Sequence, residues 1–200
     1  MSTPLTTDLL GLVLAGGRSE RMGQDKGSLE WSGQLLVNHC RLLLEPFCGE
    51  VLVSTRADQS PLAAYKGLRR VIDHTSFKGP AAGLAAAWAA HADAALLVLA
   101  VDLPLVDSRM LDSLIRQRDP AQIATVYRHP NGILEPLCAI WEPRAADRLR
   151  EAAGASGAPS LRRILEDGPI ASLTPSEPAR LASCNTPDAY AAAQESFLTL

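Results

Sequence analysis

Short, uninterrupted aliphatic runs alternate with longer segments of helical character along the first part of the chain. The runs at residues 9–14 and 94–101 contain no charged residue, a pattern typical of strands buried on both faces of a sheet. Further strands are predicted at residues 50–55 and 70–72, and helices at residues 35–44, 60–67, 80–92 and from Ser108, as N-cap, to about Arg118. Such alternation of strands and helices predicts a mainly parallel sheet covered by helices.

The pattern changes in the last part of the chain. Two strands, at residues 123–128 and 135–141, are joined by the turn-rich linker 129–132. Helices are expected at residues 143–153 and 160–166, a strand at 170–173, and a last helix opened by Thr186 or Asp188. We therefore expect an α/β protein, a Rossmann-like, three-layer open sheet that is mainly parallel and has helices on both faces. Its 200 residues suit one domain with an N-terminal part at about 9–118 and a C-terminal part at about 119–200.

Composition and charge narrow the class of protein. Hydrophobic residues make up 47% of the chain and charged residues 20%, which excludes a disordered chain. The net charge of −3 argues against a nucleic-acid partner, because duplex binders carry a basic excess. No apolar run approaches the roughly 20 residues of a membrane span, and residues 1–10 carry Asp8 but no basic residue, unlike a signal peptide. We expect a soluble protein of the cytoplasm with no membrane contact.

The cysteines and histidines suggest no metal site. Cys40, Cys48, Cys138 and Cys184 form no C-x-x-C pair and stand among apolar neighbours, which suits reduced, buried thiols. The four histidines show no regular metal-ligand spacing.

A glycine-rich loop at residues 15–23 follows the first strand, at the position where open α/β sheets bind phosphates. Its spacing fits neither the dinucleotide motif G-x-G-x-x-G nor the Walker A motif. Gly16 and Gly17 still allow backbone N–H groups to approach a polyphosphate, and Arg18, Arg21 and Lys26 supply positive charge. The alternative is a loop of solvated basic side chains.

Asp102 directly follows the uncharged strand at residues 94–101. A carboxylate at the end of a buried strand faces the crevice in which such sheets bind ligands, and Mg²⁺ is held there by one or two carboxylates and substrate phosphates. The alternative is a carboxylate that caps a turn. Residues 78–83 form a second glycine turn that opens a helix, either as part of the nucleotide pocket or as a plain helix start.

Four motifs occur together and in order along the chain. They are L-A-G-G-x-x-x-R-M-G-x-D-K at 14–26, G-P-x-A-G at 79–83, D-x-P at 102–104 and N-T-P at 185–187. In this combination, over about residues 9–190, the chain resembles the MobA-like molybdenum cofactor guanylyltransferases. The first motif alone marks the wider nucleotidyltransferase superfamily. The resemblance implies the fold of the nucleotide-diphospho-sugar transferases.

The resemblance also implies roles for the matching positions. The implied nucleotide-binding residues are Leu14, Ala15, Gly16, Gly17, Lys26, Ser54, Asp73, Gly79, Gly83 and Asp102. Lys26, Arg21 and Asp102 would be catalytic, with Asp102 also holding Mg²⁺, for which Mn²⁺ could substitute. Glu135 and Asn185 would bind the acceptor. Ser54 departs from relatives that carry asparagine at this position, and the loop between Asp73 and Gly79 varies in length; both departures leave the roles of these residues open.

The implied reaction is transfer of GMP from GTP to molybdopterin, with release of pyrophosphate. No Ser-His-Asp or Cys-His constellation is needed, because a phosphate nucleophile is already ionised near neutral pH. Molybdoenzymes or other proteins of cofactor biosynthesis are further partners that the resemblance suggests. Two alternatives stay open: cytidylyl or another nucleotidyl transfer to a phosphorylated small molecule, and a non-catalytic nucleotide-binding regulatory protein. The L-A-G-G sequence disfavours cytidylyl transfer, for which L-A-A-G is typical, and retention of Lys26 and Asp102 disfavours loss of catalysis.

Overall fold

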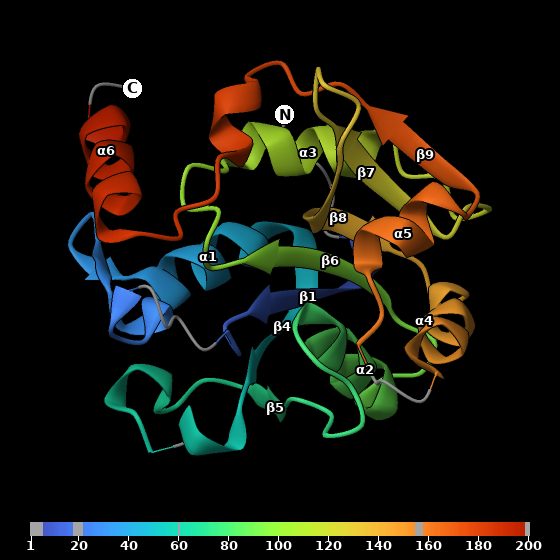
Figure 1. Ribbon diagram of the computed structural model, residues 1–200, viewed down its shortest axis with the longest axis horizontal. Helices are drawn as coiled ribbons and strands as arrows, with labels where there is room; N and C mark the ends of the chain where they lie inside the picture. The colour runs from blue at the N-terminus through green and yellow to red at the C-terminus, as the bar shows by residue number, and fades with distance from the viewer. Residues whose placement is uncertain (1–5, 18–21, 60, 155–157, 199–200) are drawn as a thin grey trace.

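The computed structural model describes residues 6–17, 22–59, 61–154 and 158–198, and a seven-stranded sheet forms the centre of this part (Figure 1). The strands follow the order β5-β4-β1-β6-β8-β7-β9. Their bounds are Thr6–Leu14 for β1, Cys48–Thr55 for β4, Arg70–Ile72 for β5, Ala95–Ala100 for β6, Ala124–Arg128 for β7, Leu134–Trp141 for β8 and Ile170–Leu173 for β9. A separate hairpin pairs β2 (Glu30–Trp31) with β3 (Gln34–Leu35).

The sheet is mainly parallel, as predicted. Strands β5, β4, β1 and β6 are parallel neighbours, with Leu12 paired to Leu52 on one side and to Val98 on the other. Strand β8 runs antiparallel to both β6 and β7, and β9 returns parallel to β7. Because β8 is reversed, its first residues lie at the same edge of the sheet as the carboxyl end of β6.

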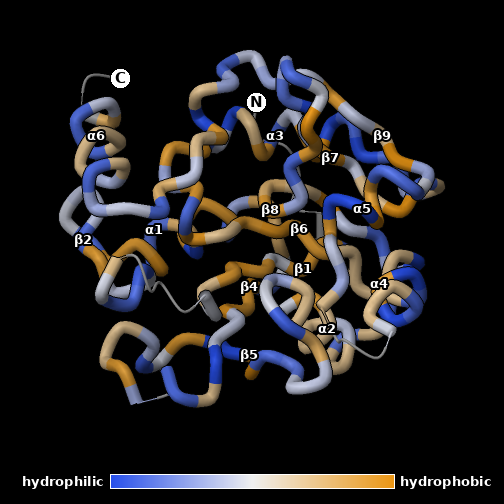
Figure 2. Tube along the Cα trace, in the orientation of Figure 1, coloured by the Kyte–Doolittle hydropathy of each residue, from blue (hydrophilic) through white to orange (hydrophobic). Residues whose placement is uncertain are grey.

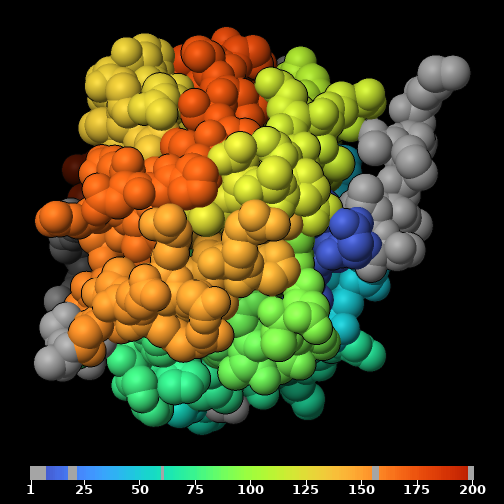
Figure 3. All heavy atoms as spheres, turned by 90° about the vertical axis from the view of Figure 1, so that its right-hand side faces the viewer, coloured from blue at the N-terminus to red at the C-terminus, as the bar shows by residue number. Residues whose placement is uncertain are grey.

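Helices cover both faces of the sheet, which confirms the predicted layers. Alternate residues of β1 and β6 enter two separate cores, because successive strand residues point to opposite faces. One core contains residues of α1 (Leu36–Leu44) and α3 (Ser108–Arg116). The other contains residues of α2 (Pro80–Ala90), α4 (Ala145–Ala153) and α5 (Leu161–Glu166). In Figure 2 apolar colours follow the central strands, and Figure 3 shows the face that α4 and α5 cover.

The last helix, α6 (Pro187–Leu198), packs on the small hairpin, a contact that the sequence did not predict. The ring of Trp31 lies 5.5 Å from that of Tyr190 and 5.4 Å from that of Phe197. The Tyr190 hydroxyl donates to the carbonyl of Glu30 at 2.5 Å. Thr186 caps the helix, since its hydroxyl accepts from the N–H of Ala189 at 3.3 Å.

One predicted helix is absent, and one predicted N-cap is wrong. Residues 60–67 do not form a helix in their described part, which contains only the 3₁₀ turn Ala63–Tyr65. The Tyr65 side chain is fully buried in tertiary contacts, and so short a segment gains too few hydrogen bonds to propagate as an α-helix. Asp107, not Ser108, is the N-cap of α3, because its carboxylate accepts from the N–H of Met110 at 3.0 Å.

The four cysteines are free and buried, as predicted. No helix in the described ranges is long and apolar enough to cross a membrane.

A buried ion pair secures the sheet at the end opposite to the glycine-rich loop. Arg118 binds Glu142 through two parallel contacts of 2.7 and 3.0 Å, and the Glu142 side chain is only 3% exposed. Arg118 also reaches Asp8, at the start of the described part of β1, at 2.6 Å. The pair therefore joins the turn after α3 to the ends of β1 and β8.

Replacement of Glu142 by alanine should lower the free energy of unfolding by about 2–3 kcal/mol, because it leaves the half-buried Arg118 charge without its bidentate partner. Urea denaturation measures this loss. The control is Asp167→Ala, which removes the exposed partner of Arg163, 3.3 Å away, and should change stability by less than about 0.5 kcal/mol. Equal losses in the two variants would contradict a structural role for the buried pair.

Candidate active site at the carboxyl ends of the strands

The carboxyl ends of β1, β4 and β6 meet at one edge of the sheet, because the three strands are parallel neighbours. The chain leaves each strand with its backbone still paired. The N–H of Ala15 donates to the carbonyl of Ser54 at 3.0 Å, and that of Val101 donates to the carbonyl of Leu14 at 3.1 Å. The loops that follow are thus held together at their origin, as the crevice of an open α/β sheet requires.

Three predicted site residues from distant parts of the chain come together at this edge. The Lys26 ammonium donates to Oδ1 of Asn185 at 2.6 Å, across 159 positions of sequence. The N–H of Cys184, next to Asn185, donates to the carbonyl of Asp102 at 2.8 Å. Lys26 is 9% exposed, so its charge is held close to the protein interior. Because Thr186 caps α6, the Asn185 side chain is available for this contact.

The Asp102 carboxylate fits a divalent cation. Its Oδ1 atom is buried and makes no hydrogen bond within the described ranges. Burial raises the pKa of Asp102, and the nearby Lys26 charge opposes this shift. No cluster of three or more His, Cys, Asp or Glu side chains suited to a metal occurs among the described residues, but Mg²⁺ needs only one or two carboxylates when phosphate oxygens complete its coordination.

The Asp73 carboxylate lies against the glycine-rich loop. A Cβ atom on Gly16 would stand 2.0 Å from Oδ2 of Asp73, so any larger residue would require the Asp73 carboxylate to move. The Ser54 hydroxyl donates to Oδ1 of Asp73. Burial raises the pKa of Asp73, whereas the Ser54 hydrogen bond and the Arg56 charge lower it. Gly16, Ser54 and Asp73 therefore form one cluster at the ends of β1 and β4.

Gly83 and Gly79 serve the packing of α2 beside this cluster. A Cβ on Gly83 would stand 2.5 Å from both Cδ2 of Leu14 and Oγ of Ser54, so glycine lets the helix approach β1 and β4 closely. Gly79, the N-cap of α2, has φ +62°, which favours glycine. Both predicted glycines lie at this edge of the sheet. A larger residue would meet neighbouring side chains at Gly83 and would strain the backbone at Gly79.

Glu135 lies at the start of β8, near the carboxyl end of β6. Its Oε1 accepts from the N–H of Leu137 at 2.9 Å, and its Oε2 lies 3.6 Å from Nε2 of His129. Burial is the largest cause that raises the pKa of Glu135, and the negative charge of Asp102 adds to it. Both carboxylates therefore belong to the same electrostatic neighbourhood.

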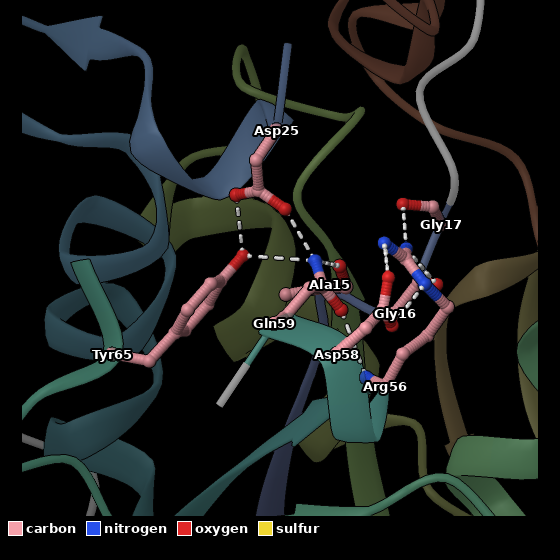
Figure 4. Close-up of polar contacts among 8 residues, drawn as sticks. All are labelled: Ala15, Gly16, Gly17, Asp25, Arg56, Asp58, Gln59 and Tyr65. Carbon is pink, nitrogen blue, oxygen red and sulfur yellow. Dashed lines mark hydrogen bonds and ion pairs between the residues drawn. The ribbon is translucent and has the colours of Figure 1, made fainter. Parts of the chain in front are cut away.

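Sequence analysis missed a polar network behind the glycine-rich loop (Figure 4). Gln59, 1% exposed, donates to the carbonyl of Ala15 at 2.9 Å and also to Asp25. The Tyr65 hydroxyl donates to Oδ1 of Asp25 at 2.6 Å. These side chains hold the two ends of the loop, and no periodic pattern in the sequence marks them.

Arg56 was also missed, although it directly follows a predicted strand, the same signal that marked Asp102. Its guanidinium donates to the carbonyls of Gly16 and Gly17. Gly17 itself is exposed, and Arg21, predicted beside the phosphates, lies outside the described residues.

Comparisons with known proteins identify the family of the chain. Residues 11–173 match the family model of the MobA-like NTP transferase domain. The molybdenum cofactor guanylyltransferase of Pseudomonas paraeruginosa is 34% identical over 183 residues, which cover 90% of this chain and 91% of that protein.

Solved structures share the fold. Molybdopterin-guanine dinucleotide biosynthesis protein A of Archaeoglobus fulgidus, 24% identical, superposes with a TM-score of 0.79 over 96% of this chain and 100% of that one. A Mycobacterium tuberculosis protein determined in complex with manganese, 19% identical, gives a TM-score of 0.69 over 94% of this chain and 98% of that one. On the family match and the identity to curated relatives, the chain belongs to the MobA-like NTP transferase family and is a nucleotidyltransferase.

Proposed function

We propose that this protein transfers GMP from GTP to molybdopterin and releases pyrophosphate, with nucleotide bound by about residues 9–118 and acceptor by about residues 119–200 of one domain. The observation that carries the proposal is the convergence of Lys26, Asp102 and Asn185 at the carboxyl ends of the strands. Relatives named molybdenum cofactor guanylyltransferase, at 34% identity over most of the chain, support the choice of GTP and molybdopterin.

The nucleotide side of the reaction is served by the glycine-rich loop and Lys26. The backbone of residues 14–17 lines the triphosphate, and Ser54, Asp73, Gly79 and Gly83 line the nucleoside. Lys26 stabilises the negative charge that develops on the leaving pyrophosphate, and Arg21 is proposed to assist it. Asp102 would hold a divalent cation, Mg²⁺ or Mn²⁺, which when bound would supply charge neutralisation and Lewis acidity.

The acceptor side is served by Asn185 and Glu135. An oxygen of the molybdopterin phosphate attacks the α-phosphorus of GTP, and the bond from that phosphorus to the oxygen bridging to the β-phosphate breaks. The attacking phosphate carries no proton that must be removed, so alignment and suppression of anion repulsion are the main tasks of the protein. Alignment of two bound reactants can contribute roughly 7–11 kcal/mol to barrier lowering. The contact between Lys26 and Asn185 supports neighbouring sites for the two substrates.

GTP should be strongly preferred over CTP and ATP. The half-buried Asp73 carboxylate stands beside the nucleotide loop, and a pocket that reads guanine by hydrogen bonds leaves its polar groups unpaired when another base binds. Pyrophosphate release with each NTP, Mg²⁺ and purified molybdopterin measures the preference, and thermal-shift titration with Mg²⁺ and each NTP gives a second readout. Equal turnover and equal stabilisation by CTP would point to a cytidylyltransferase instead.

Asp102→Asn should reduce turnover at least about 100-fold, since an amide oxygen is a weaker ligand for Mg²⁺ and one key electrostatic contact contributes about 3 kcal/mol. The thermal midpoint without ligand should stay equal or rise. Burial raises the folded-state pKa of Asp102 above its unfolded value, so ionisation as pH rises through that interval destabilises the fold, and asparagine has no charge to bury. High Mn²⁺ should restore part of the activity. Most activity retained at ordinary Mg²⁺ would return Asp102 to the turn residues.

Asn185→Ala should weaken binding of molybdopterin more than binding of GTP, because it removes an amide at the acceptor side of Lys26. Separate titrations of the two substrates measure the difference. The control is Gln194→Ala, which removes a hydrogen bond from α6 to the carbonyl of Glu30, 3.0 Å away, and should cost at most about 1 kcal/mol of stability while leaving the ratio of the two affinities unchanged. A selective loss of GTP affinity in Asn185→Ala would reverse the assignment of the two sides.

A further inference from the structure

The Arg56 guanidinium is hydrogen-bonded to the backbone of the glycine-rich loop (Figure 4). Its Nη1 donates to the carbonyl of Gly16 at 2.8 Å and to that of Gly17 at 2.5 Å. Arg56 directly follows β4, so it reaches the loop from the neighbouring strand across 40 positions of sequence. Two successive carbonyl oxygens of the loop are therefore drawn to one cationic side chain.

Asp58 fixes the orientation of that guanidinium. Nε of Arg56 lies 2.9 Å from Oδ1 of Asp58, and Nη2 lies 3.1 Å from Oδ2. These two parallel contacts leave the planar guanidinium little rotational freedom. A lysine ammonium at this position would still be free to rotate. The Asp58 side chain is 73% exposed, so the ion pair by itself adds little to stability. Its effect is on where Nη1 points.

Peptide geometry links these carbonyls to the opposite side of the loop. A trans peptide is planar, and the N–H of each residue points away from the carbonyl of the residue before it. The described residues contain no cis peptide bond. With the Gly16 carbonyl held by Arg56, the N–H of Gly17 points away from Arg56. Gln59 holds the Ala15 carbonyl at 2.9 Å and in the same way sets the direction of the Gly16 N–H.

We propose that Arg56, oriented by Asp58, is a positioning residue for triphosphate binding. It draws the Gly16 and Gly17 carbonyl oxygens, which would repel phosphate, to the back of the loop. The N–H of Gly17 is thereby presented to phosphate oxygens, as in backbone anion sites. This inference rests on the proposed function, which puts the triphosphate at this loop.

A substitution at Asp58 distinguishes two roles for Arg56: positioning of the loop backbone, and simple attraction of phosphate by its positive charge. If Arg56 acted only through its positive charge, removal of the Asp58 negative charge would strengthen phosphate binding. If Arg56 acts through the direction of its donors, removal of Asp58 weakens phosphate binding, because the guanidinium loses its fork. The two hypotheses therefore predict opposite signs for Asp58→Ala.

The test is calorimetric titration of the full chain, without acceptor, using GTP and guanosine in the presence of Mg²⁺. Arg56→Gln should lower the affinity for GTP about 10- to 100-fold, as expected for lost charge-assisted hydrogen bonds, and leave the affinity for guanosine unchanged. Asp58→Ala should lower the GTP affinity about threefold or more, again without effect on guanosine. The matched control is Arg69→Gln, which breaks an exposed ion pair with Glu50 and should change neither affinity.

The outcomes are distinguishable. Equal losses for GTP and guanosine in Arg56→Gln would indicate a merely structural role and overturn the inference, as would tighter GTP binding in Asp58→Ala. An unchanged ratio of GTP to guanosine affinity in both variants would overturn it while leaving the proposed function intact. A wild-type protein that binds GTP no better than guanosine would overturn the proposed function together with the inference.

Discussion

Burial of β1 and β6 on both faces is the constraint on which the rest of the structure depends. Each of these strands contributes side chains to two cores. Apart from Asp8 in β1, neither strand carries a charged side chain along its described length. The first polar groups can appear only where the strands end. Since the central strands are parallel, those ends coincide, and backbone amides, Lys26 and Asp102 collect at one edge. The candidate site forms at this edge because the centre of the sheet excludes charged side chains.

At that edge the opposite charges of Lys26 and Asp102 each reduce the free-energy cost of burying the other. Asp102 has a raised pKa because it is buried, and Lys26 stabilises its ionised form. The Lys26 ammonium in turn donates to Asn185, which is delivered by the segment before α6. That segment is secured by aromatic packing of α6 on the β2–β3 hairpin, around Trp31. The packing of α6 on the hairpin, around the buried Trp31, thus determines where Asn185 lies.

Glycines stand at two positions where a side chain from another element closely approaches the backbone. Gly16 makes space for the Asp73 carboxylate, and Gly83 makes space for Leu14 and Ser54. Without a Cβ at these two positions, α2 and the loop after β5 can close on the end of β1. Arg56 then acts on the same loop from behind, through its carbonyls. Steric space and hydrogen bonds from neighbouring segments together fix the backbone of residues 15–17.

The sequence by itself determined the alternation of strands and helices, the mainly parallel sheet, the buried thiols and the position of Asp102, because burial leaves a local periodic trace. Only the tertiary structure decided which polar groups meet. The bond of Lys26 to Asn185 spans 159 positions and that of Arg56 to Gly16 spans 40. Residues 60–67 were misassigned for the same reason: tertiary contacts of Tyr65, not local propensity, set the backbone there. Hydrophobic spacing encodes which face is buried, whereas a hydrogen bond between distant residues is specified only once the fold has brought them together.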